Sequence, residues 1–258
     1  MNDMLEFMRS LAAAAEAETM PRFRQLPAVV NKLGSGFDPV TEADREAERA
    51  IRALIGETFP DDGILGEEFG LANADALRQW IIDPIDGTRA FISGIPLWGT
   101  LVGLTSGGRA VAGMMSQPFT GELYLANDSG AFLEHRQGKQ RLSTSRVDNL
   151  SEATMCTTTP ALFSPTQREA YDRLENEVRL ARYGTDCYAY AMLASGHVDL
   201  VVEPGLNAYD IAALIPIIEQ AGGVVTTFDG GRPENGGNII AAANARLHEQ
   251  ARAFIANV

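Results

Sequence analysis

Two aspartates, Asp83 and Asp86, lie three positions apart where a short apolar run ends in the stretch WIIDPIDGT, residues 80–88. Two carboxylates about 4 Å apart repel each other by roughly 4 kcal/mol at an effective dielectric constant near 20. A cation between them would remove this repulsion, and Mg²⁺ prefers carboxylate, carbonyl and water oxygens, often completed by substrate phosphate. The stretch therefore predicts a Mg²⁺ site, with the Ile85 carbonyl as a further oxygen ligand.

Gly87 and Thr88 follow the second aspartate directly. Glycine lets the backbone approach a ligand closely, and the N–H groups of both residues can donate hydrogen bonds to phosphate oxygens. Metal ions promote phosphate-ester hydrolysis because they polarise the phosphoryl group, lower the pKa of a bound water and stabilise the leaving oxygen. The pattern thus indicates phosphate chemistry.

Four more acidic residues stand at junctions between expected elements: Glu67 and Glu68 in ILGEEFG, Asp44 in DPVTEAD and Asp210 in NAYDIAALIP. Each has a simpler interpretation. Asp44 and Asp210 could cap helix N-termini, and Asp83 could start a turn with Pro84. We expect Glu68 to be a solvated neighbour of Glu67. The conjunction of the other acids with DGT favours one shared site.

The first half of the chain predicts two helices and an antiparallel sheet. The helices cover residues 1–19 and 41–58, and the second opens with a capping-box spacing that has Asp44 in place of the usual Glu. Runs bounded by Gly, Ser, Asn and Pro predict strands over 80–84, 97–105, 110–117, 121–127 and 130–135.

From about residue 140 the pattern alternates between strands and helices, which indicates layered α and β structure. Strands are expected over 154–159, 178–182, 198–203, 224–228 and 238–243, and helices over 165–177, 187–196, 209–221 and the C-terminus. Pro216 should bend or interrupt the third of these helices. No linker stands out, so we expect one domain over 1–258, with a sheet half at 1–140 and an alternating half at 141–258.

The composition excludes several classes of partner. With 258 residues, 45% of them hydrophobic, the chain can bury a substantial core. Its formal net charge of −13 argues against nucleic acid or an anionic membrane as a partner. No signal peptide or membrane span is recognisable, so a cytoplasmic location is expected. Cys156 and Cys187 lack metal-ligand spacing and are expected to be buried, reduced thiols.

Four motifs in this order resemble the inositol monophosphatase superfamily of Mg²⁺-dependent, lithium-sensitive phosphatases: DPVTEADREAE, ILGEEFG, WIIDPIDGTRAF and AYDIAALIPIIEQAGGVV. The resemblance covers nearly the whole chain. It implies an α/β (α+β) fold, a layered αβαβα sandwich of the inositol monophosphatase and fructose-bisphosphatase type. It also implies a homodimer, two to three Mg²⁺ ions and a small phosphorylated metabolite as substrate.

The resemblance assigns site residues position by position. The metal ligands would be Glu67, Asp83, the Ile85 carbonyl, Asp86 and Asp210. The catalytic set would be Asp44, Thr88 and Glu67, with Asp44 and Thr88 orienting and helping to deprotonate the attacking water. Gly87 and Thr88 would hold the phosphate, and Asp210 would also contact the substrate. The segment NKLGSGFDP spaces Lys32 differently from the family's loop, which leaves a role for Lys32 at a third metal open.

Two variable segments, DGTRAFISGIPLWGTL and YGTDCYAYAMLASGHVDLVVEPGLNAYD, are more similar to the histidinol-phosphate phosphatase branch. Asp186 places a carboxylate where inositol enzymes have a small apolar residue, and Glu203 should lie near it. A carboxylate pairs well with the ammonium group of histidinol phosphate, whereas inositol offers only hydroxyls. Alternatively, Asp186 caps the following helix.

The sequence therefore predicts a phosphomonoesterase that converts L-histidinol phosphate to L-histidinol in histidine biosynthesis. A broad inositol-1-phosphate phosphatase is the first alternative, and a nucleotide 3′-phosphatase or sugar bisphosphatase is a more distant one. A non-catalytic, metal-dependent binding protein on the same scaffold is the alternative of another class. The intact acidic set argues against it, because a binding protein has no need of a water-activating pair.

Overall fold

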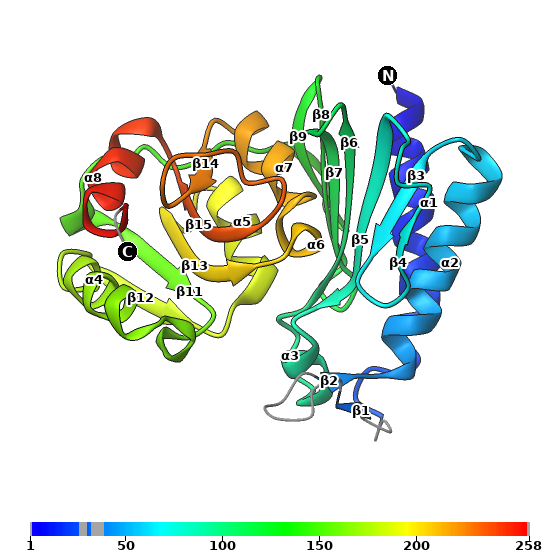
Figure 1. The fold of residues 1–258 in the computed structure, drawn as a ribbon, viewed down its shortest axis with the longest axis horizontal. Helices are drawn as coiled ribbons and strands as arrows, with labels where there is room; N and C mark the ends of the chain where they lie inside the picture. Colours follow the sequence, from blue (N-terminus) through cyan, green and yellow to red (C-terminus); the bar gives the residue numbers. More distant parts are fainter. Residues whose placement is uncertain (1, 26–29, 32–38, 257–258) are drawn as a thin grey trace.

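Two β-sheets organise the chain, and the computed structural model describes residues 2–25, 30–31 and 39–256. The larger sheet has eight strands in the order β10-β9-β8-β7-β6-β5-β3-β4, and the smaller has five in the order β12-β11-β13-β15-β14. Figure 1 shows helices outside each sheet and between the two sheets. The predicted αβαβα sandwich is therefore confirmed.

The large sheet contains the strands that lead into the predicted metal loop. Strands β5 to β9 pair antiparallel, as predicted, whereas β3 pairs parallel to β5. The bounds are β3 (Gly63–Gly66), β4 (Gly70–Ala72), β5 (Arg78–Asp86), β6 (Gly99–Ser106), β7 (Arg109–Gln117), β8 (Glu122–Asn127), β9 (Gly130–His135) and β10 (Gly138–Arg141). A separate two-stranded ladder joins β1 (Val30–Asn31) and β2 (Pro39–Val40).

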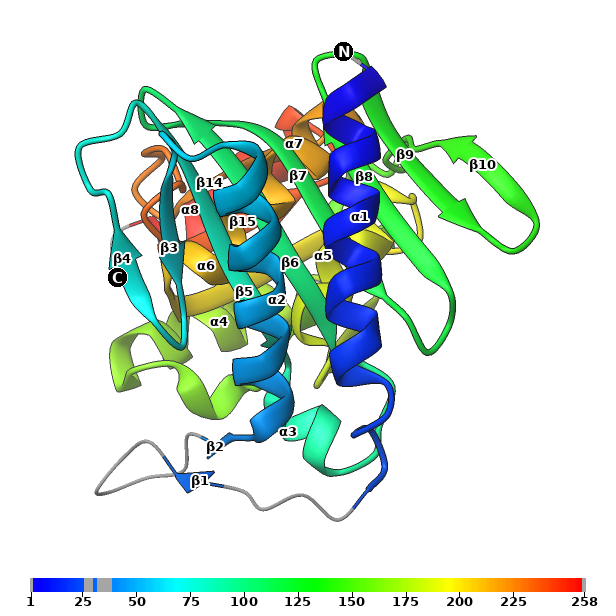
Figure 2. The ribbon, with the colours of Figure 1, turned by 90° about the vertical axis from the view of Figure 1, so that its right-hand side faces the viewer.

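Helices α1 (Asn2–Thr19) and α2 (Glu42–Thr58) cover the outer face of the large sheet, as Figure 2 shows. Both bury an apolar stripe, because residues three and four apart lie on one helix face. Met8 and Leu11 of α1 share a core with Ile51 of α2 and Trp80 of β5. The predicted capping box at Thr41 is present, so α2 begins where the sequence indicated.

The central layer consists of α5 (Asp186–Ala194), α6 (Ala208–Ile211) and α7 (Leu214–Gln220). The sequence predicted one helix interrupted near Pro216, and the break falls just before it, between α6 and α7. The junction lies directly on the large sheet, since a Cβ on Gly103 would lie 2.8 Å from the backbone carbon of Ala212. Asp210 is thereby held beside the end of β5.

The small sheet packs on the other side of this layer, and α4 (Pro165–Glu175) and α8 (Ala245–Ile255) cover its outer face. Its strands are β11 (Thr154–Thr157), β12 (Leu180–Tyr183), β13 (Leu200–Leu206), β14 (Val224–Thr227) and β15 (Gly237–Ala242). Two short 3₁₀ helices, Leu150–Glu152 and Pro160–Leu162, flank β11. Within the described residues, no helix is both long and apolar enough to cross a membrane.

Candidate active site

Three aspartates converge where β5 ends beside α6. Oxygen atoms of Asp83, Asp86 and Asp210 all lie within 4.8 Å of one another. The register of β5 against β6 shifts between Asp83 and Asp86, and Asp83 Oδ1 accepts a hydrogen bond of 3.1 Å from the Ile85 N–H. The chain therefore does not leave β5 in the turn that the simpler interpretation predicted, but makes an irregularity in the strand at Pro84, and both carboxylates lie close to Asp210.

The electrostatics of these aspartates favour a bound cation. Burial, and then the negative charges of Glu67 and Asp86, raise the pKa of Asp83 well above its ordinary value. Burial is also the main reason that the pKa of Asp86 is raised and that the pKa of Asp210 rises to about 6. Crowded carboxylates with raised pKa values fit a hard divalent cation, which supplies the missing positive charge.

Asp44 and Thr88 meet beside this cluster from different elements. Asp44 is 1% exposed in the first turn of α2, and its Oδ2 accepts hydrogen bonds from the backbone N–H of Thr41 at 2.9 Å and from the Thr41 hydroxyl at 2.6 Å. The Thr88 hydroxyl lies 3.4 Å from Asp44 Oδ1 and 3.1 Å from the Ile85 carbonyl oxygen. Asp44 therefore both caps α2 and contacts the hydroxyl of the DGT motif. Asp210 likewise caps α6 through Asn207.

Gly87 links the cluster to the short helix α3 (Thr88–Ile92). Its φ of +84° lies in the left-handed region, where glycine is favoured. A Cβ at this position would lie 3.0 Å from the Leu97 carbonyl oxygen and 3.4 Å from the Asp186 Cβ. Any side chain here would crowd the Leu97 carbonyl and strain the backbone that leads into Thr88.

Glu67 and Glu68 occupy the turn between β3 and β4. Glu67 donates its backbone N–H to the Ile82 carbonyl at 3.1 Å, and its side chain reaches the cavity described below. The expectation for Glu68 was wrong, because its side chain is only 3% exposed and lies 3.8 Å from the Arg45 guanidinium. Tertiary packing buries the Glu68 side chain, and its position next to Glu67 in the sequence does not indicate this.

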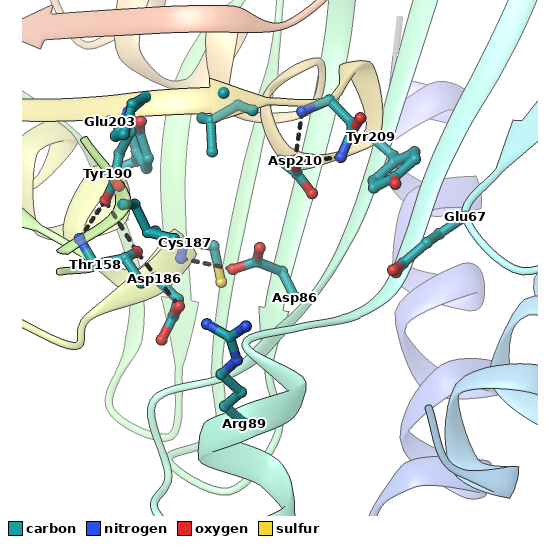
Figure 3. A pocket seen from close by; sticks show the side chains of 15 residues that line it. Glu67, Asp86, Arg89, Thr158, Asp186, Cys187, Tyr190, Glu203, Tyr209 and Asp210 are labelled. Atoms are coloured by element: carbon teal, nitrogen blue, oxygen red, sulfur yellow. Dashed lines mark hydrogen bonds between the residues drawn. The ribbon is translucent and has the colours of Figure 1, made fainter. Parts of the chain in front are cut away.

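A cavity of about 320 Å³ extends from the aspartates toward α5 and β13. Figure 3 shows Asp86 and Arg89 between Glu67 on one side and Asp186, Thr158 and Glu203 on the other. The lining residues are Glu67, Asp86, Arg89, Thr158, Leu162, Asp186, Cys187, Tyr190, Glu203, Pro204, Gly205, Leu206, Asn207, Tyr209 and Asp210. This volume suits a small metabolite.

The far wall of the cavity brings Asp186 and Glu203 together, as the sequence predicted. The Thr158 hydroxyl lies 3.0 Å from Glu203 Oε1 and 3.4 Å from Asp186 Oδ1, so it bridges the two carboxylates. The Thr158 N–H also donates to Glu203 Oε1, at 2.7 Å. Burial raises the pKa of Asp186, and burial is the largest reason that the pKa of Glu203 rises to about 8.

The alternative role for Asp186, as a helix cap, does not hold. Asp186 is the first residue of α5, and its side chain faces Thr158. The N–H of Cys187 instead donates to the Asp86 carboxylate at 2.7 Å. The N-terminus of α5 is therefore capped by the metal loop, which leaves Asp186 in the cavity wall.

Comparison with known proteins identifies the family. The inositol monophosphatase family model matches residues 1–257. The chain belongs to the inositol monophosphatase family. Because the related proteins are named phosphatases, the chain is a phosphoric monoester hydrolase, which removes the non-catalytic alternative.

Relatives with two different named substrates align over most of this family member. It is 37% identical to a histidinol-phosphatase of Streptomyces coelicolor over 98% of this chain and 97% of the relative. It is 33% identical to an inositol-1-monophosphatase of Caulobacter vibrioides, covering 86% of this chain and 88% of the relative. The solved structure of an inositol monophosphatase from Zymomonas mobilis superposes with a TM-score of 0.87 and 37% identity, covering 98% of each chain.

Several lining residues of this inositol monophosphatase family member escaped the sequence analysis, and three of them carry polar groups that bear on the chemistry of the cavity. Thr158 follows β11, and the pairing of β11 with β13 brings it beside Glu203, which is 45 positions later in the chain. Tyr190 is 2% exposed, and its hydroxyl has no hydrogen-bond partner among the described residues. Arg89 directly follows the DGT motif, and its positive charge partly offsets the rise that burial causes in the pKa of Asp186. Of these three residues, only Arg89 stands beside a recognisable motif in the sequence, as the arginine of DGTRAF.

Other predictions concern residues around the site. Cys156 and Cys187 are free and buried, as expected. For Trp98 the sequence favoured a core position and left a pocket position open. Trp98 is fully buried in the core against Phe23 and Phe91, and it is not among the described residues that line the cavity. Lys32 lies outside the described residues.

Proposed function

We propose that this phosphatase hydrolyses L-histidinol phosphate to L-histidinol and inorganic phosphate with Mg²⁺ as cofactor. The observation that carries the proposal is a pair of carboxylates on the far wall of the cavity, the buried Glu203 and the half-buried Asp186. Histidinol phosphate would place its ammonium and imidazole groups on the far side of the phosphate. Charge-assisted hydrogen bonds to a carboxylate are about twice as strong as neutral ones.

The charge balance of this wall supports a cationic leaving group. Among the described residues that line the cavity, Arg89 is the one basic residue, and its positive charge acts on Asp186. Magnesium ions would balance the aspartates of the metal cluster but not these two acids. A substrate ammonium would supply the second positive charge that these two acids need when both are ionised. Because its pKa is about 8, Glu203 retains much of its proton at neutral pH until a cation displaces it.

The proposed Mg²⁺ ligands are Glu67, Asp83, the Ile85 carbonyl, Asp86 and Asp210, which would hold two to three ions. When bound, such ions polarise the phosphoryl group and lower the pKa of the attacking water. The backbone N–H groups of Gly87 and Thr88 would hold phosphate oxygens, and Asp210 would contact the substrate at the rim.

Asp44 and Thr88 would handle the proton of the attacking water. The Thr88 hydroxyl can donate its hydrogen to Asp44 Oδ1 while its oxygen accepts a hydrogen bond from the water. Burial raises the pKa of Asp44, which makes this carboxylate a better proton acceptor than an exposed aspartate. Glu67, opposite the far wall, would complete the catalytic set beside the water.

Inositol 1-phosphate is the second candidate substrate, and a specific feature favours it. Glu203 already accepts hydrogen bonds from threonine hydroxyls, at 3.0 Å from Thr158 and 3.4 Å from Thr157. The hydroxyls of a sugar-like ring could bind the same oxygens. The Caulobacter vibrioides relative is named for this activity. Nucleotide 3′-phosphates and sugar bisphosphates are more distant candidates.

Phosphate release by the purified protein tests the proposal. L-histidinol phosphate, inositol 1-phosphate, a nucleotide 3′-phosphate and a sugar bisphosphate would be compared at equal concentration with Mg²⁺. We expect histidinol phosphate to give the highest kcat/KM, and faster hydrolysis of another ester would overturn the proposal. A role in histidine biosynthesis, a cytoplasmic location and a homodimer are further parts of this proposal, and size-exclusion chromatography with light scattering tests the dimer.

A further inference from the structure

Helix α2 presents three charged residues on one face at four-residue spacing: Asp44, Glu48 and Arg52. Residues four apart lie above one another on a helix. Asp44 is 1% exposed beside Thr88, and Glu48 is fully buried one turn later. The Arg52 side chain is 17% exposed and lies 2.7 Å from Glu48, measured from Nε to Oε1. None of these three residues lines the cavity.

The Glu48 carboxylate binds the turn that carries Glu67. Its Oε2 accepts a hydrogen bond of 2.7 Å from the Glu68 N–H, and its Oε1 accepts one of 3.3 Å from the Phe69 N–H. On the other side of the same turn, Glu48 packs so closely against Gly66 that no Cβ would fit there. One buried carboxylate thus holds the residues on both sides of Glu67.

Arg52 completes the attachment of this turn. Its Nη2 donates a hydrogen bond to the Gly70 carbonyl, where β4 begins, while its Nε neutralises Glu48. Both carboxylate oxygens of Glu48, and the Nε and Nη2 atoms of Arg52, are therefore directed at the turn or at the partner side chain. A buried carboxylate left without such partners would be strongly destabilising.

The packing of α2 against the large sheet does not depend on the Glu48–Arg52 ion pair. Ala47, Ile51 and Ile55 already bury their side chains in the core with Trp80. A buried ion pair contributes little more to stability than well-packed apolar residues would. What apolar residues cannot do is accept two successive backbone N–H groups and so fix the direction of the side chain before them.

We propose that Glu48 and Arg52 are positioning residues that hold Glu67 at a fixed distance from Asp44. Because α2 carries both Asp44 and the pair, movement of the turn relative to the helix would change the spacing between a metal ligand and the proton acceptor. The inference rests on the proposed role of Glu67 as a Mg²⁺ ligand. It does not depend on which phosphate ester is the substrate.

The test measures Mg²⁺ binding without any substrate. Melting temperatures of EDTA-treated wild type, Glu48→Gln, Arg52→Lys and Glu67→Gln would be followed during titration with Mg²⁺. Glu48→Gln keeps the size of the side chain but turns one acceptor into a donor that faces backbone N–H groups. We expect its Mg²⁺ midpoint to rise about 10- to 100-fold, the range found for residues that orient metal ligands. Lysine has a single ammonium group and cannot bind the Glu48 carboxylate and the Gly70 carbonyl as the arginine guanidinium does. Arg52→Lys should therefore give a smaller rise in the Mg²⁺ midpoint.

Glu134→Gln is the matched control. Glu134 also forms a two-pronged ion pair, with Arg9 at 2.7 and 2.8 Å, but it lies on β9 away from the cavity. Its Mg²⁺ midpoint should equal that of wild type. Excess Mg²⁺ should restore most of the kcat of Glu48→Gln on whichever ester the wild type hydrolyses best.

Two outcomes overturn the inference. The first is a wild-type Mg²⁺ midpoint in folded Glu48→Gln, or in Arg52→Lys if the glutamine variant does not fold. The second is a normal midpoint in Glu67→Gln, which would show that the turn holds no metal ligand. If histidinol phosphate is not the preferred substrate, only the phosphate-release assay would show it, and these Mg²⁺ midpoints would not change.

Discussion

The Asp86 carboxylate accepts a hydrogen bond of 2.7 Å from the backbone N–H of Cys187, 101 positions later in the chain. This bond joins the metal loop at the end of β5 to the first turn of α5, which carries Asp186. A charged carboxylate at a helix N-terminus is also favoured by the helix dipole. The loop that carries Asp86 and the cavity wall that carries Asp186 are therefore fixed to each other directly.

Replacing Asp83 by Asn should abolish activity without unfolding the protein. The substitution removes one of several repelling charges and little volume, so the metal-free variant should melt at the same temperature as wild type or higher. Mg²⁺ should then no longer stabilise it. Calorimetry with and without Mg²⁺ measures this, and Asp75→Asn, at an exposed position, serves as the control. Retention of wild-type turnover in Asp83→Asn would refute the metal assignment.

Thr88→Ala and Asp44→Asn should lower kcat far more than they weaken Mg²⁺ binding. Both residues would act on the proton of the attacking water, and general acid–base groups contribute about 10²- to 10⁴-fold. Thr88→Ser keeps the hydroxyl and should retain most of the activity. Steady-state kinetics at saturating Mg²⁺ decide the matter, and a kcat within a few-fold of wild type for Thr88→Ala would exclude this role.

Mg²⁺ affinity should increase as the pH rises from about 5.5 to about 7.5. The raised pKa values of Asp83 and Asp86, and the pKa of about 6 for Asp210, mean that the metal-free cluster holds protons. Mg²⁺ must displace these protons, so binding competes with acid. Isothermal titration in buffers with different ionisation enthalpies would measure the protons released. Affinity that is independent of pH, with no proton release, would contradict the electrostatics of the site.

Tyr190→Phe should affect stability and substrate binding in opposite directions. The buried Tyr190 hydroxyl has no protein partner among the described residues, and an unsatisfied buried polar group costs about 1–3 kcal/mol. Its removal should therefore raise the melting temperature. If the hydroxyl binds the leaving group, KM for histidinol phosphate should rise while kcat changes little. Melting curves and kinetics on the same preparation test both expectations, and an unchanged KM would remove Tyr190 from the binding surface.

The sequence predicted the elements whose hydrophobic pattern is long and regular. The strand expected at 130–135 matches β9, and the helix expected from residue 165 matches the start of α4. Strands β3, β4 and β10 were missed because they are short and each begins with glycine, a residue depleted in strands. β10 is also fully exposed, so it shows no alternation of buried and exposed positions.

The acidic residues of the site were predictable because local motifs mark them. Asp83 and Asp86 stand beside Pro, Gly and Thr, and Asp44 and Asp210 begin helices. The residues that support them carry no such mark. Glu48 reads as an ordinary charge within a helix, and only the approach of the β3–β4 turn gives it a role. Long-range pairing of this kind follows from the tertiary fold, which a local pattern does not specify.

The most direct test of the account is the ratio of kcat/KM for L-histidinol phosphate to that for inositol 1-phosphate, measured in wild type and Asp186→Ala. If Asp186 binds the ammonium group, the wild-type ratio should be well above one. The variant should lose about 1.5–3 kcal/mol of transition-state stabilisation on histidinol phosphate, roughly 10- to 150-fold, and much less on inositol 1-phosphate. A wild-type ratio below one, or the same ratio in both proteins, would contradict the proposed substrate.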